Sequence, residues 1–198
     1  MGARTIRKPR CCIYKFYRGI EYATGRYSSH NGQLTNFRMK HRSALNDICI
    51  RTAIDSDVPG ISRLLRSLSH TYIVSPDHPE VGRFLATLND EAISAFVHRP
   101  DVVYLVAVTS ARELVGAAAI SDNQNVEHLF VEPACQGAGL GRRLWEQLRD
   151  HALQSGNPGL FKVNSSLNAV PIYERFGFVI AAPKVEKFGG AYVPMILK

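Results

Sequence analysis

A glycine-rich loop between an apolar strand and a helix constrains this chain more than any other feature. The segment 126–145 reads VEHLFVEPACQGAGLGRRLW, and its loop at 136–141 carries three glycines in five positions. Glycine lets the backbone approach a bulky anionic group, and the N–H groups at the start of the following helix can bind that anion. The loop therefore predicts a site for a phosphate-bearing cofactor at the end of a strand.

Two other phosphate-binding loops do not fit this pattern. A Walker-type loop ends in Gly-Lys-Ser/Thr, whereas two arginines follow the last glycine here. A dinucleotide-binding loop needs Gly-x-Gly-x-x-Gly and an acidic residue about 20 positions further on. Here the third glycine comes one residue early, and residues 159–162 contain no acid. The pattern Gln/Arg-x-x-Gly-x-Gly/Ala is matched by Gln136, Gly139 and Gly141. On this motif alone, a plain glycine-rich turn stays open as an alternative.

A second motif, Tyr-Glu-Arg-Phe-Gly-Phe, ends the segment 164–178, some thirty residues after the loop. Together with the strand 129–131, its Glu-Pro turn and the glycine loop, it resembles the two signatures of the GNAT superfamily, the Gcn5-related N-acetyltransferases. The resemblance is good over 115–180, looser over 48–198 and absent before residue 48. It implies an α/β (mixed α+β) fold, in which a splayed, mixed, largely antiparallel sheet has helices on both faces.

Hydrophobic periodicity along 48–198 agrees with that architecture. We expect strands at about 48–53, 102–108, 114–120, 126–131, 160–163, 178–184 and 191–197. We expect helices at about 57–69, 79–98, 140–155 and 169–175. The second and third of these strands are predicted to form an antiparallel hairpin. Residues 48–198 are therefore expected to form one GNAT acetyltransferase domain.

Charge separates this predicted domain from the residues before it. Residues 1–47 hold ten Lys/Arg against two acidic residues, whereas residues 48–198 hold fourteen against fifteen. The basic N-terminal extension, 1–47, has three interpretations: a disordered arm that binds nucleic acid or another polyanion, a mitochondrial-type presequence, or an upstream start that is not native. We favour the last, because Met39 is a natural start for a domain whose first strand opens near Ile48. Nucleic acid is expected as a partner only if this arm is real.

Composition bounds the compartment and the cofactor chemistry. Four cysteines show neither C-x-x-C nor Cys/His metal-ligand spacing, no signal peptide is apparent, and no apolar run is long enough to cross a bilayer. We therefore expect a cytoplasmic protein with reduced thiols and no metal.

The resemblance implies how the acyl donor, acetyl-CoA, is held. The diphosphate would lie on the loop and the first helical turn, the pantetheine arm would pair with the strand, and a backbone N–H near Phe130 would stabilise charge on the thioester oxygen. The expected cofactor-binding residues are Leu129, Phe130, Val131, Gln136, Gly137, Ala138, Gly139, Leu140, Gly141 and Arg142. Many family members carry an asparagine seven residues before a tyrosine in the second motif. This chain has Ser166 there and Asn168 two residues later, so either residue is a candidate for the pantetheine contact.

Two residues are the candidate catalytic groups. Glu127 is the candidate base or water relay, and strict strand alternation would place it on the face of Asn125 and Leu129, with His128 on the opposite face. Its alternative role is an exposed strand carboxylate. Tyr173, in the second motif, matches the family's general acid for the leaving thiolate; its alternative role is an aromatic core residue. Cys135 has no activating neighbour in sequence, which disfavours an acetyl-cysteine route.

The implied reaction is transfer of the acetyl group of acetyl-CoA to a primary amine by direct attack in a ternary complex. A small-molecule amine is the first choice of acceptor and a protein amine the second. A homodimer stays open. The alternative function is a non-catalytic acyl-CoA-binding regulatory module of the same fold.

Overall fold

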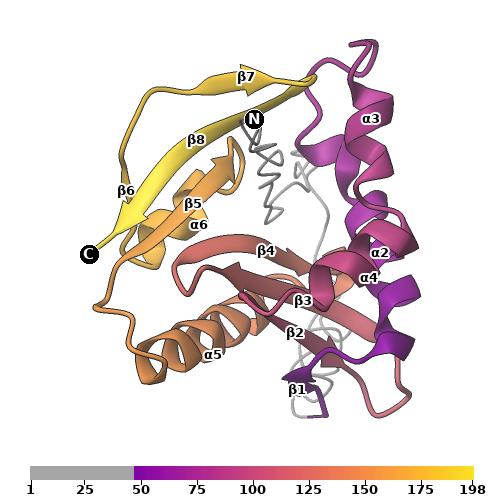
Figure 1. Cartoon of the computed structure of the whole chain (residues 1–198), viewed down its shortest axis with the longest axis vertical. Helices are drawn as coiled ribbons and strands as arrows, with labels where there is room; N and C mark the ends of the chain where they lie inside the picture. The colour runs from indigo at the N-terminus through magenta and orange to yellow at the C-terminus, as the bar shows by residue number, and fades with distance from the viewer. Residues whose placement is uncertain (1–46) are drawn as a thin grey trace, which may run out of the picture.

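The computed structural model describes residues 47–198 (Figure 1). The strands are β1 (Cys49–Thr52), β2 (Val102–Val108), β3 (Leu114–Ser121), β4 (Asn125–Val131), β5 (Phe161–Ser166), β6 (Val179–Ile180), β7 (Val185–Lys187) and β8 (Gly190–Leu197). The helices are α2 (Val58–Ser67), α3 (Val81–Ala86), α4 (Asp90–Val97), α5 (Leu140–Gln154) and α6 (Val170–Arg175). The predictions for the basic extension and for Met39 fall on residues 1–46, outside the described part of the chain.

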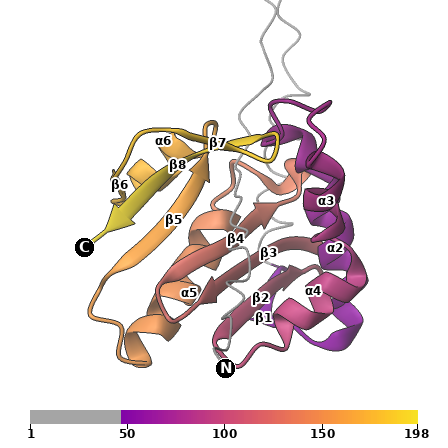
Figure 2. The ribbon, with the colours of Figure 1, turned by 45° about the horizontal axis from the view of Figure 1, so that its top comes forward.

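All the strands join one mixed sheet, in the order β1-β2-β3-β4-β5-β8-β6, with β7 also paired to β8. Within residues 47–198, every pairing between these strands is antiparallel except β4–β5, which is parallel and consists of two residue pairs, Asn125 with Lys162 and Val126 with Val163. Beyond these pairs the two strands diverge, which Figures 1 and 2 show as the opening between β4 and β5. The predicted splayed, largely antiparallel sheet is confirmed.

Helices cover both faces of the sheet and define two hydrophobic clusters. The α5-side cluster packs the apolar stripe of α5 against one face and includes Leu129 and Val131 of β4. The α2–α4-side cluster packs the opposite face and includes Phe130. Trp145 of α5 is 2% exposed and contacts the rings of Phe161 and Phe178, so α5 is fixed to the sheet by aromatic packing.

The prediction of one helix over 79–98 is wrong. The structure has two helices, α3 and α4, because Asn89 adopts an extended conformation and accepts a hydrogen bond of 2.8 Å from Ala92 N–H as the N-cap of α4. The strand predicted at 178–184 is also too long. It consists of β6 alone, and a loop containing Pro183, which has no N–H to donate, separates it from β7.

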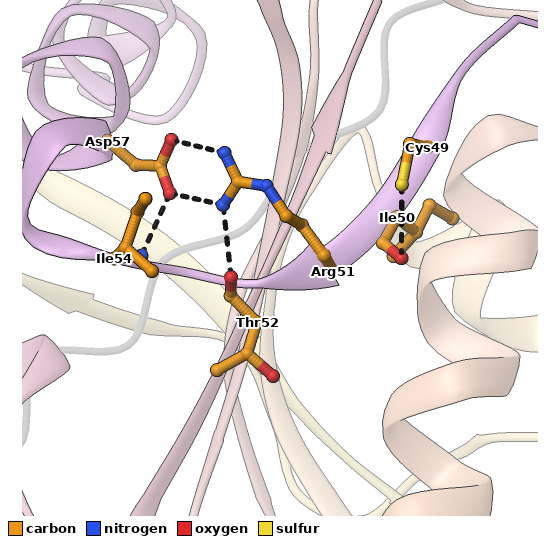
Figure 3. Close-up of polar contacts among 6 residues, drawn as sticks. All are labelled: Cys49, Ile50, Arg51, Thr52, Ile54 and Asp57. Carbon is orange, nitrogen blue, oxygen red and sulfur yellow. Dashed lines mark hydrogen bonds and ion pairs between the residues drawn. The ribbon is translucent and has the colours of Figure 1, made fainter.

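The start of α2 is held to β1 by an ion pair (Figure 3). The two Nη atoms of Arg51 lie 2.6 and 2.9 Å from the carboxylate oxygens of Asp57, which also accepts a bond of 2.8 Å from Ile54 N–H. Burial acts to raise the pKa of Asp57, but the bonds from Arg51 and Ile54 N–H outweigh it, and the net pKa lies below its ordinary value. Asp57 therefore fixes the entry to the helix as a carboxylate.

The loop after α2 also contacts the hairpin formed by β7 and β8, across the opening between β4 and β5. The chain after α2 forms a β-bridge from Ile73 to Gly190, and the N–H groups of Val74 and Ser75 donate to the carbonyl of Gly189 at 2.8 and 3.0 Å. This loop–hairpin contact, residues 73–75 against 188–190, lies where the turn between β7 and β8 reaches α3 in Figure 1. Within residues 47–198, no helix combines the length and apolar composition needed to cross a membrane.

Candidate active site

A β-bulge in β4 sets the direction of the candidate base. The β3–β4 register runs from Gly116–Val131 to Ala119–His128 and then shifts, so that Ile120 pairs with Val126 and Glu127 is the extra residue. A bulge places two residues opposite one and so interrupts the alternation of side chains. Val126 lies in the α5-side cluster, whereas His128 contacts aromatic rings of the α2–α4 side.

Glu127 shares the α2–α4 side with His128, which corrects the predicted face. Its Oε1 accepts a hydrogen bond of 2.5 Å from Ser121 Oγ. In β3, Ala118 and Ile120 belong to the α5-side cluster, so Ser121, which follows Ile120, points to the opposite face. Glu127 is only 5% exposed, which also excludes the exposed-carboxylate interpretation.

Ser121 contacts the candidate base and was not among the residues expected from the sequence. It is 1% exposed and ends β3, where it pairs with Asn125. The available signal was a small hydroxyl residue on the inward face at the end of an apolar strand. Nothing in the sequence, however, showed that the bulge would turn Glu127 toward it.

His128 lies beside Glu127 but is unsuited to act as a base. Burial lowers its pKa to about 3, and its Nδ1 lies 2.9 Å from the hydroxyl of Tyr104. Burial also raises the pKa of Tyr104 well above its ordinary value, so both groups are neutral near pH 7. Tyr104 and His128 therefore form an uncharged, packed pair of side chains beside Glu127.

The backbone of β4 presents hydrogen-bonding groups to the splay. The N–H of Glu132 donates to Val115 of β3, and bonded pairs alternate along an antiparallel ladder. The groups of Phe130 therefore point to β3, whereas those of Leu129 and Val131 point toward β5, which does not pair with them in the described structure. The oxyanion donor predicted near Phe130 is better assigned to Leu129 or Val131. The Phe130 side chain instead packs toward α2, with its ring 6.3 Å from that of Tyr72.

The glycine loop has the conformation that the sequence pattern suggests. Gly137 and Gly139 have φ values of 79° and 89°, and an added Cβ on either would meet no atom within 4 Å. The space beside both glycines is therefore open, and the first N–H groups of α5 have no acceptor within the helix. Ala138 is exposed, while Leu140 and Gly141 are buried against the sheet. Gln136 donates from Nε2 to the carbonyl of Val131 at 2.8 Å and so ties the loop to the end of β4.

The two arginines after the loop differ in their surroundings. Arg142 is exposed, lies over the ring of Phe176 at 5.2 Å, and approaches the carbonyl of Arg175 at 3.4 Å. Arg143 donates to the carbonyl of Ile48 at 3.2 Å and so connects α5 to the chain entering β1. Arg142 thus stays a candidate phosphate ligand, and Arg143 has a structural contact.

Ser166 and Asn168 flank the end of β5 in different environments. Ser166 is 1% exposed, and its Oγ has no hydrogen-bond partner within the described residues. Asn168 is exposed. A buried hydroxyl without a partner is unfavourable, and a bound amide-containing arm would satisfy it. Ser166 is therefore the better candidate for the pantetheine contact.

Tyr173 of α6 is 1% exposed and packs edge-on against Phe176 and Phe178, at 6.1 and 5.3 Å between ring centres. It belongs to the α5-side cluster. Cys135 precedes the loop, and burial raises the pKa of its thiol, which disfavours the thiolate. The structure thus places Tyr173 and Glu127 on opposite faces of the splayed sheet.

Comparison with known proteins agrees with this geometry. A sequence model of the family described as "Acetyltransferase (GNAT) domain" matches residues 74–198. A protein of Azospirillum brasilense named "IAA acetyltransferase" is 33% identical over 92 residues, which are 43% of this chain and 60% of that relative. The chain thus spans less than two thirds of this relative's length.

Solved structures share the fold at low sequence identity. The PaiA N-acetyltransferase of Thermoplasma acidophilum in complex with coenzyme A has a TM-score of 0.61 at 15% identity, over 75% of this chain and 97% of its own. The spermidine N-acetyltransferase of Vibrio cholerae, in complex with CoA and spermine, has a TM-score of 0.57 at 17% identity, over 77% and 96%. The GNAT family uses acetyl-CoA, and the open glycine loop, the part of β4 that lies beyond its two pairs with β5 in the described residues, and the buried Ser166 hydroxyl fit that molecule. The chain belongs to the GNAT acetyltransferase family.

Proposed function

We propose that this protein transfers the acetyl group of acetyl-CoA to a primary amine by direct attack in a ternary complex. The observation that carries the proposal is the splay between β4 and β5, with a candidate base on one face and a candidate acid on the other. In the tetrahedral adduct of acyl transfer, the amine nitrogen and the thioester sulfur are separate substituents of the carbonyl carbon, so a base can act at one and an acid at the other. Glu127 on the α2–α4 side and Tyr173 on the α5 side suit that arrangement.

Coenzyme binding is assigned to the α5 side. The N–H groups of residues 137–142 would hold the diphosphate, helped by the helix dipole. Leu129 and Val131 would pair with the pantetheine amides, and one of their N–H groups would donate to the thioester oxygen as charge develops there. Ser166 would bind the pantetheine arm. Acetyl-CoA supplies an activated acyl carbon when bound.

The proton transfers balance with these two residues. Glu127 takes a proton from the substrate ammonium, and the neutral amine forms the new C–N bond as the C–S bond breaks. Tyr173 donates its hydroxyl proton to the sulfur, and the tyrosinate is reprotonated by the extra proton on the cationic nitrogen of the adduct, which leaves the neutral amide. The proton on Glu127 returns to solvent, so one proton is released per acetyl group transferred.

A small-molecule amine is the preferred acceptor. The spermidine N-acetyltransferase of Vibrio cholerae, which shares the fold, supports testing polyamines first. A lysine side chain in a peptide is the second class to test.

The test is thiol release from acetyl-CoA in the presence of spermidine, n-butylamine, free lysine or a lysine peptide. We expect turnover with at least one amine and a loss of roughly 10²–10⁴-fold in kcat/KM for Glu127→Gln. Glu132→Gln is the matched control, because Glu132 lies in the turn after β4. Equal activity of the two variants would remove Glu127 as the base. Tight acetyl-CoA binding without turnover on any amine would favour the non-catalytic alternative.

A further inference from the structure

We infer that Ser121 is a positioning residue for the reaction: it orients the Glu127 carboxylate and stabilises its ionised form. The inference rests on the proposed function, in which Glu127 accepts the proton of the amine. It adds a residue on a neighbouring strand, outside both sequence motifs, to the machinery of proton removal.

The contact is short, buried and geometrically constrained. Ser121 Oγ lies 2.5 Å from Glu127 Oε1, which is short even for a hydroxyl donating to a carboxylate. The two residues are 1% and 5% exposed, so little water competes for the carboxylate oxygen. Both residues lie on the paired strands β3 and β4. The position of the serine hydroxyl oxygen is set by rotation about one bond only, the Cα–Cβ bond of Ser121.

The bulge makes this contact possible. Without the extra residue, alternation along β4 would direct the side chain at position 127 to the α5 side, away from Ser121. With it, Glu127 and Ser121 both face the α2–α4 side, and the buried carboxylate accepts the serine hydroxyl at 2.5 Å. A hydrogen bond donated to a buried carboxylate stabilises its charged form and adds to the attraction of the Arg99 cation.

Other titratable groups around Glu127 come from each neighbouring element. They are Arg99 and Asp101 before β2, Tyr104 of β2, Asp122 after β3, His128 of β4, and Lys162, which pairs with Asn125 from β5. The charges of Glu127 and Asp122 help raise the pKa of Arg99, although the bond to Asp101 is the largest cause, and Arg99 stays cationic. His128, with its pKa near 3, and Tyr104 stay neutral across the working range. The acid limb of the activity profile is therefore expected to report Glu127.

The serine hydroxyl donates to the ionised form of Glu127, and this determines what its loss would do to the reaction. A donor to the carboxylate favours the charged form, so its loss favours the protonated form, which cannot accept a proton from the amine. The loss also frees the side chain to rotate, which lowers the fraction of enzyme with the base in place.

The experiment is the pH dependence of kcat/KM for the full chain with the best amine found above, using Ser121→Ala, Ser121→Thr and Ser62→Ala. Ser62 is the matched control, because it is another buried serine that donates to a different acceptor. The residue is 3% exposed, and its Oγ donates at 2.7 Å to the carbonyl of Leu88. For Ser121→Ala we expect the acid limb to move up by about one to two pH units and kcat/KM at pH 7 to fall roughly tenfold or more. Ser121→Thr should keep the wild-type profile, and acetyl-CoA affinity should stay constant in all three.

Two outcomes separate this inference from the proposed function. If Glu127→Gln is impaired but Ser121→Ala has the same acid limb as Ser62→Ala, the positioning role is wrong and the base assignment stands. If Glu127→Gln has wild-type turnover, both fail. Should Ser121→Ala not fold, Ser121→Cys replaces it, since the thiol is a weaker donor of similar size and should shift the acid limb in the same direction.

Discussion

Substitution of Gly189 by alanine tests how closely the two sides of the splay are joined. Gly189 is the second central residue of the two-residue turn between β7 and β8, and Phe188 and Gly189 have φ values of 55° and 77°. Positive φ at both central residues is the type I′ pattern that suits the twist of a hairpin. A Cβ at Gly189 would lie 2.5 Å from Val81 Cγ2 and 2.8 Å from the carbonyl oxygen of Ser75.

Two effects add in this variant. Placing alanine in the left-handed region costs about 1–2 kcal/mol. Forcing an extra methyl into packed surroundings typically costs about 1–3 kcal/mol more, because Val81 or the backbone of Ser75 must move. The expected total is roughly 2–5 kcal/mol of unfolding free energy, the sum of the backbone strain and the clash with Val81 and Ser75.

Urea denaturation measures this effect, with Gly156→Ala as the control. Gly156 has φ of 86°, but its Cβ would meet nothing within 4 Å, so this control has the strain without the clash. With m of about 2 kcal/mol/M, Gly189→Ala should lower the midpoint by roughly 1–2.5 M and Gly156→Ala by roughly 0.5–1 M. Equal shifts for the two variants would show that the contact is not tightly packed and would refute the reasoning.

Three further predictions concern the site and its support. Tyr173→Phe should lower turnover by roughly 10²-fold while acetyl-CoA affinity measured by titration stays at the wild-type value; unchanged turnover would exclude Tyr173 as the acid. Cys135→Ala should keep activity, and intact mass after incubation with acetyl-CoA should show no acetyl-enzyme on the wild type; a stable adduct on Cys135 would contradict direct transfer. Asp57→Asn should lose about 1 kcal/mol of stability at pH 7. Because the folded pKa of Asp57 is lowered, its stabilisation is present above about pH 4 and is lost as pH falls through the folded value, so the difference between wild type and variant should shrink in acid. A difference that stays constant down to the lowest pH at which both fold would contradict the ion-pair account.

Local patterns were sufficient for most of the fold. The stripe on α5 recurs at every third to fourth residue because one face of that helix is buried, and the continuous apolar runs of β2 and β3 reflect strands buried on both faces. The same rule failed at 79–98, because the apolar spacing continues across a break that Asn89 makes by capping a new helix. Capping depends on backbone dihedrals that the hydrophobic pattern does not report.

The site shows the same division between local and non-local information. The left-handed conformation of Gly137 and Gly139 was predictable, because glycine adopts positive φ without the steric cost that other residues have. The orientation of Glu127 was not, since a bulge changes the face of one side chain without any sequence signature here. The Ser121 contact depends on that bulge and on strand register. The backbone groups of Leu129 and Val131 could be assigned to the opening between β4 and β5 only once it was known which residue pairs of the β3–β4 ladder are hydrogen-bonded.

The most direct test of the central claim is calorimetric titration of the full chain with acetyl-CoA, with CoA and ATP as comparison ligands and Gly139→Glu as the variant. The φ of Gly139 is 89°, and a carboxylate there would oppose the diphosphate. Saturable binding of acetyl-CoA and CoA but not ATP, abolished by the substitution, is the predicted result. Absence of CoA binding by the folded protein, or wild-type affinity in the Gly139→Glu variant, would contradict the assignment of the loop at 136–141 as the coenzyme site.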